Sequence, residues 1–70
     1  MPINLADKGV KYTIQRIAGK DEVRHHLASL GFVPGEEVIV VSEVNGNYVI
    51  ALKDTRIGVG RELAKMIIVA

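Results

Sequence analysis

The chain has 70 residues, 49% of them hydrophobic, with no cysteine and a net charge of +1. This leaves room for one domain, residues 1–70, and excludes disulfides and thiolate metal sites. The interspersed charges argue against nucleic-acid binding and against a membrane-surface protein. Because no apolar run approaches the ~20 residues that span a bilayer, we expect a soluble cytoplasmic protein without membrane insertion.

The first predicted element is a strand from Val10 to Ala18, preceded by a polar lead-in over Asn4–Gly9. Apolar and polar residues alternate along this strand with the period of two that marks a half-buried strand. The alternation breaks at Arg16 and Ile17, which predicts a β-bulge or the end of the strand there.

A helix is predicted next, with Asp21 as its N-cap, because a carboxylate can accept hydrogen bonds from the free N–H groups of the first turn. Val23, Leu27 and Leu30 follow at helical spacing and form one apolar stripe. Gly31 provides the left-handed residue that ends many helices.

The segment Leu30-Gly31-Phe32 predicts a Schellman motif, in which Phe32 packs against Leu27 one turn back. Pro34-Gly35 then predicts a turn, since proline fixes φ and glycine accepts a positive φ.

Two strands rich in β-branched residues follow, Val38–Val44 and Asn47–Lys53. Between them, Asn45-Gly46 is the strongest short hairpin pattern, because a type I′ turn needs two residues with positive φ. The sequence therefore predicts a central β-hairpin.

This hairpin is apolar on both faces, which a sheet with one solvent-facing side does not explain. A two-residue loop places Ile39 and Val41 on one face with Ile50 and Leu52. Two interpretations remain open: the curvature of a barrel buries both faces, or part of the apolar surface meets a partner.

The C-terminal third predicts a turn at Asp54-Thr55, a short strand over Arg56–Gly60, one helical turn over Gly60–Lys65 and a last strand over Met66–Ala70. The predicted fold is therefore mostly β, a small SH3-like barrel of about five strands with one short α-helix between the first and second strands. The alternative is an open sheet with the helix on one face.

The search for chemistry identifies no catalytic motif and no phosphate-binding loop, so we predict a protein that is not an enzyme and has no cofactor. His25 and His26 are weak metal-ligand candidates. Adjacent helix positions point about 100° apart, so the two side chains cannot chelate one ion together. We interpret them as a solvated residue and a boundary residue.

The chain resembles the FeoA family over residues 10–69. The motifs that carry the resemblance are the run Leu30-Gly31-Phe32-Val33-Pro34-Gly35-Glu36-Glu37-Val38, the strand pair Val49–Lys53 and Arg56–Val59, and the closing segment Glu62–Val69. The family's pattern often has alanine at Gly58 and a polar residue at Gly60, and both glycines are expected to loosen the fourth strand.

The resemblance implies an SH3-like barrel that acts as a cytosolic accessory protein of ferrous iron uptake, with the GTPase region of the membrane transporter FeoB as its partner. The same domain type occurs at the C-terminus of DtxR-like repressors. Without cysteine or a ligand cluster, the protein is expected to contribute a surface instead of carrying iron. We predict that surface around Ile39, Val41, Tyr48 and Ile50.

Three alternatives remain open. A small nucleic-acid-binding barrel predicts binding that weakens steeply with salt. A metal-sensing regulatory domain predicts ferrous or manganous binding that depends on His25 and His26. A homodimer through the apolar face predicts a concentration-dependent mass.

Overall fold

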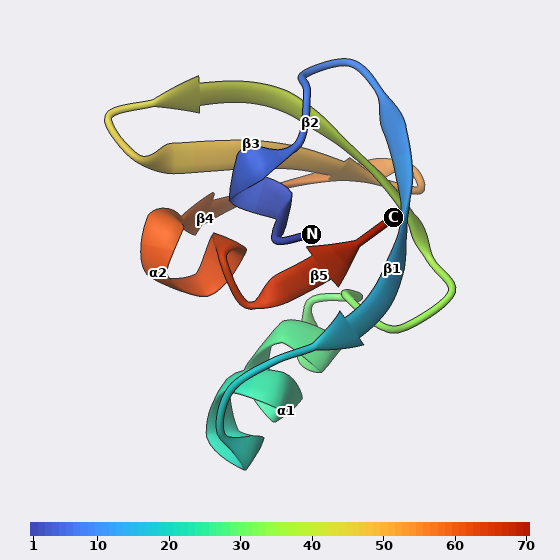
Figure 1. Cartoon of the computed structure of the whole chain (residues 1–70), viewed down its shortest axis with the longest axis vertical. Coiled ribbons are helices and arrows are strands. Elements are labelled where there is room, and N and C mark those ends of the chain that lie inside the picture. Colours follow the sequence, from blue (N-terminus) through green and yellow to red (C-terminus); the bar gives the residue numbers. More distant parts are fainter.

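The computed structural model covers residues 1–70 and is mostly β-structure (Figure 1). The five strands are β1 (Lys11–Ile17), β2 (Glu37–Val44), β3 (Asn47–Leu52), β4 (Thr55–Gly60) and β5 (Ile67–Val69). The helices are the 3-10 turn η1 (Ile3–Leu5), α1 (Asp21–Ser29) and α2 (Arg61–Ala64). The prediction of about five strands, with one short α-helix between the first two, is confirmed.

All neighbouring strands are antiparallel, in the order β4-β3-β2-β1-β5. Strand β1 pairs with two neighbouring strands: Lys11–Thr13 pair with β2, and Ile14–Ile17 pair with β5. The register shifts between Ile14 and Arg16, so the break in the alternation marks a bulge. The resulting bend carries β5 round beneath the central hairpin, which gives a barrel in place of a flat sheet (Figure 1).

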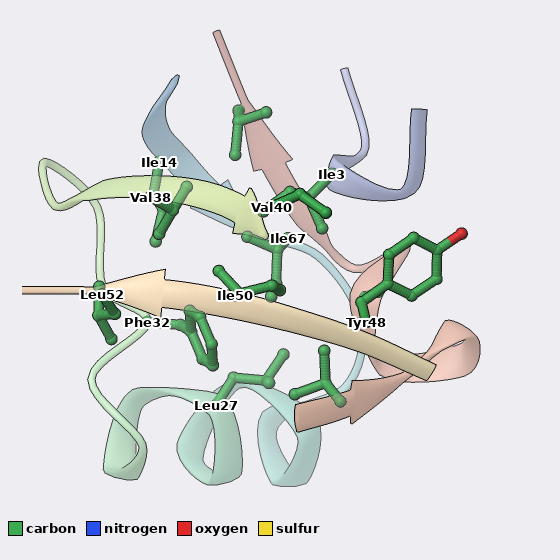
Figure 2. Close-up of a cluster of buried hydrophobic side chains, with 13 residues drawn as sticks. Ile3, Ile14, Leu27, Phe32, Val38, Val40, Tyr48, Ile50, Leu52 and Ile67 are labelled. Atoms are coloured by element: carbon green, nitrogen blue, oxygen red, sulfur yellow. The ribbon is translucent and has the colours of Figure 1, made fainter. Parts of the chain in front are cut away.

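The core fills the inside of this bend and contains only apolar residues and Tyr48 (Figure 2). Leu27 from α1 and Phe32 from the following loop reach it from one end, and Ile3 from η1 reaches it from another. Ile3 directly precedes the polar lead-in predicted over Asn4–Gly9, and no element was predicted there. A single isoleucine gives no periodicity, so the sequence pattern did not reveal it.

Helix α1 begins one residue earlier than predicted. Lys20 takes the N-cap position with extended backbone. Asp21 lies inside the first turn, where its carboxylate accepts a hydrogen bond from the Arg24 guanidinium. The N-cap assignment of Asp21 was therefore wrong. Its charge still favours this end of the helix, because the free N–H groups there carry partial positive charge.

The end of α1 is the predicted Schellman motif. The Phe32 N–H donates to the Leu27 carbonyl at 3.0 Å, and the Gly31 N–H donates to the Ala28 carbonyl at 2.9 Å. Gly31 has φ +103°, and the side chains of Leu27 and Phe32 are both fully buried. Pro34-Gly35 forms the next turn, closed by a hydrogen bond from the Glu36 N–H to the Val33 carbonyl at 3.2 Å.

The central hairpin has the predicted two-residue loop, with φ +53° at Asn45 and +81° at Gly46. The Gly46 N–H also donates to the Glu43 carboxylate at 2.8 Å. The next turn lies at Lys53-Asp54, one residue before the predicted Asp54-Thr55. Lys53 has φ +55°, a left-handed backbone that is uncommon for residues other than glycine. A lysine therefore did not indicate a turn at this position.

Candidate functional site

The structure separates the four residues predicted to form a partner-binding surface. Ile50 is fully buried and Tyr48 is 8% exposed, so both belong to the core. Val41 is 37% exposed, and Ile39 lies partly exposed on the opposite side of the sheet from Ile50. The prediction that Ile39 and Val41 share a face with Ile50 and Leu52 is wrong.

A bulge in β2 is the physical reason. Val40 pairs with Ile50 and Ser42 pairs with Val49, which leaves Val41 as an extra residue. One inserted residue reverses the direction of every side chain beyond it, because side chains alternate with a period of two. Val38 and Val40 therefore face the core, and Ile39 faces outward.

The outer hairpin face, defined here by Ile39, Val49 and Ala51, is an apolar surface on the side of the hairpin that points away from the core. Ile39 pairs directly with Ala51, and Val49 lies beside Gly58, which has no side chain to cover it. All three residues of the face are partly exposed. Strand β4 pairs with β3 without a break from Thr55 to Gly60, so Gly58 and Gly60 do not interrupt it.

Charged side chains border this face. A shallow hollow of ≈ 180 Å³ is lined by Lys11, Glu37, Ile39, Ala51 and Lys53. Lys11 lies 3.9 Å from the Glu37 carboxylate, and Lys53 lies 3.1 Å from the Glu36 carboxylate. Apolar side chains within a charged border are the usual composition of a protein-interaction surface.

The two histidines are both exposed on α1. No group of three or more His, Cys, Asp or Glu side chains lies close enough together to hold a metal ion. The fold therefore does not place His25 and His26 in a group of three metal-ligating side chains.

Sequence reasoning did not identify a second hollow, which lies between α1 and the end of β1. It measures ≈ 350 Å³ and is lined by Arg16, Ile17, Arg24, His25, Ala28, Phe32, Val33 and Pro34. These residues come from a strand, a helix and a loop, so no single sequence pattern contains them. The only sequence feature that pointed there was the break in alternation at Arg16.

None of the helices has the length and the apolar composition that a membrane-spanning helix requires. In comparisons with known proteins, the family model of the FeoA domain matches residues 1–70. No curated protein matches the chain.

Several solved structures share the fold. A crystal structure of an iron uptake regulatory protein (FeoA) has a TM-score of 0.90 and 26% identity, covering 99% of this chain and 93% of its own. FeoA of Stenotrophomonas maltophilia, an SH3 domain protein complexed with zinc, has a TM-score of 0.86 and 22% identity, covering 100% and 89%. A manganese-dependent transcriptional repressor has a TM-score of 0.89 and 21% identity, covering 99% and 39%. The SH3-like architecture predicted from the sequence is confirmed.

Proposed function

The chain belongs to the FeoA domain family, and on that premise we propose that it is a non-catalytic, cytoplasmic accessory protein of ferrous iron uptake. In this proposal it acts by binding the membrane ferrous transporter FeoB at its cytosolic GTPase region. The protein contributes a surface and does not itself carry iron.

The observation that supports this proposal best is the outer hairpin face. Ile39, Val49 and Ala51 are apolar and partly exposed, on a sheet whose other side already holds a complete core. A domain of this size gains little from apolar residues on a solvent-facing strand face, whereas a partner that covers them gains the free energy of their burial. The border of the face carries both signs of charge, because Lys11 is paired with Glu37 and Lys53 with Glu36. This favours a partner with charged groups of both signs around the contact.

The test is a titration of the ¹⁵N-labelled protein with the GTPase region of the transporter, followed by amide chemical shifts. We expect the shifts to cluster on Ile39, Val49 and Ala51, and to weaken with added salt because the charges that border the face are exposed.

Two variants that add the same charge make the test specific. Ile39→Glu places a carboxylate on the outer hairpin face, and Gln15→Glu places one on exposed β1. We expect Ile39→Glu to abolish the shifts and Gln15→Glu to retain them, with both proteins still folded. Binding that survives Ile39→Glu unchanged would contradict the proposed surface, and no binding by the unaltered protein would contradict the proposed partner.

A further inference from the structure

We propose that the hollow between α1 and β1, called here the α1–β1 groove, binds an acidic peptide segment that carries one bulky apolar side chain. The inference concerns a different surface from the outer hairpin face, and it does not depend on the identity of the partner proposed above. It rests on the shape, the apolar lining and the charge of the groove.

The position of α1 leaves the groove open. The helix buries only Leu27, which together with its C-terminal Schellman motif holds it at one end of the barrel. Figure 1 shows α1 below the end of β1, away from the central hairpin. Ala28 is exposed on α1, and its small side chain leaves room between the helix and Ile17.

The lining is apolar where a ligand side chain would enter. Ile17 and Val33 are partly buried, Pro34 is exposed, and the fully buried Phe32 lies behind them. At ≈ 350 Å³ the groove lies at the small end of the range of ligand pockets, roughly 300–1,000 Å³. It therefore suits one or two apolar side chains of an extended segment.

The charged residues of the groove are all basic. Arg16 and Arg24 line it together with the polar side chain of His25, and no carboxylate does. Arg24 pairs with Asp21 one turn back, whereas Arg16 has no carboxylate within 4.0 Å. An Arg guanidinium presents its N–H donors in a fork that matches a carboxylate, so this unpaired cation favours Asp or Glu in the ligand.

A peptide fits the groove better than a nucleic acid. Single-stranded nucleic acids need exposed aromatic rings for base stacking, and the one ring in the lining, that of Phe32, is fully buried. The net charge of +1 also provides little attraction for a polyanion. A short acidic segment requires only the local charge of the groove.

The probe for the test is the peptide acetyl-Glu-Asp-Glu-Leu-Glu-Asp-Glu-amide, titrated into the ¹⁵N-labelled protein. We expect shifts at the amides of Arg16, Ile17, Arg24, Ala28 and Val33, with the outer hairpin face unaffected. The same peptide with Gly in place of Leu should bind about tenfold more weakly, because it lacks the apolar anchor. A peptide with Lys in place of every acidic residue should not bind.

Protein variants locate the site. Ala28→Glu puts a carboxylate into the groove and should abolish binding of the acidic peptide. Ala28→Gln introduces an uncharged side chain of nearly the same size as glutamate and should retain most of the binding. Arg16→Gln should weaken binding about tenfold, the effect of losing a hydrogen bond between charged groups. Arg56→Gln removes an equal charge from exposed β4, outside the groove, and should have little effect.

Three results would overturn the proposal: no shifts at millimolar acidic peptide, equal binding of the lysine peptide, or shifts that centre elsewhere on the protein. Preferential binding of a uridine oligonucleotide to the same residues would also overturn it, in favour of a nucleic-acid site. Because the probe is a synthetic peptide, these outcomes are independent of whether the transporter binds.

Discussion

Gly31 and Gly35 both have a left-handed backbone, yet their surroundings differ. Their φ values are +103° and +95°. A β-carbon on Gly31 would lie 2.8 Å from Leu52 Cδ2, whereas one on Gly35 would have no atom within 4 Å. Leu52 is itself in the core, so it cannot move aside without displacing its neighbours. Substitution of Gly35 therefore tests backbone strain alone, whereas substitution of Gly31 tests backbone strain together with steric crowding.

We predict that Gly31→Ala destabilises the protein more than Gly35→Ala. Each substitution incurs the left-handed penalty of about 1–2 kcal/mol, and Gly31→Ala adds the contact with Leu52. Thermal unfolding checks this, since each kcal/mol lowers the Tm of a domain of this size by about 4–8 °C. Equal melting temperatures would show that the close approach to Leu52 has no energetic consequence.

The residues that the sequence predicted well at this scale are those whose effect is local. Gly31-Phe32 and Asn45-Gly46 each specify a backbone conformation within a few residues, and the structure has both. Asp21 and Lys53 were misjudged because either of two adjacent residues could take the cap or the turn position. Two adjacent residues differ little in the free energy with which they favour such a position. Tertiary contacts contribute more and therefore decide which of the two takes it.

At the scale of elements, the central hairpin is organised by the bulge at Val41. The bulge brings Val38 and Val40 into the core opposite Leu52 and Ile50, and leaves Ile39 outside. A hairpin without a bulge, counted from the Asn45-Gly46 loop, would place Ile39 and Val41 in the core and leave Val38 and Val40 outside. The sequence is apolar on both faces of β2, so it provided no pattern from which the register could be determined.

We predict that Ile50→Ala destabilises the protein by about 2–5 kcal/mol, as expected for a large side chain removed from a packed core. Val41→Ala should change stability by less than about 1 kcal/mol, because Val41 lies at the bulge and is 37% exposed. Urea unfolding followed by circular dichroism measures both. If Val41→Ala proved the more damaging change, the register described here would be contradicted.

At the scale of the whole molecule, the surfaces depend on segments that are distant in the sequence. The α1–β1 groove joins Arg16 of β1, Ala28 of α1 and Val33 of the following loop. The strand content, the helix position and the barrel class could be predicted because each follows from a local pattern. The groove could not, because its shape depends on the angle at which α1 leaves the barrel, and that angle is set by packing.

The two ends of the chain also meet at this scale. The Met1 amino group donates to the Val69 carbonyl at 2.7 Å, and Pro2 forms a bridge with Ile68. This pairing places Ile3 in the core with no exposed surface, while Leu5, two residues later, is 66% exposed. A first turn without any sequence pattern thus closes the barrel beside β5.

We predict that Ile3→Ala destabilises the whole domain by about 2–5 kcal/mol, while Leu5→Ala stays within about 0.5 kcal/mol of the unaltered protein. For 70 residues the total stability is roughly 4–10 kcal/mol, so Ile3→Ala removes a large share of it. Because the core is continuous, amide signals of α1 and of the hairpin should disappear at the same urea concentration. Loss of structure confined to residues near the N-terminus would instead show that η1 packs on a barrel that is stable without it.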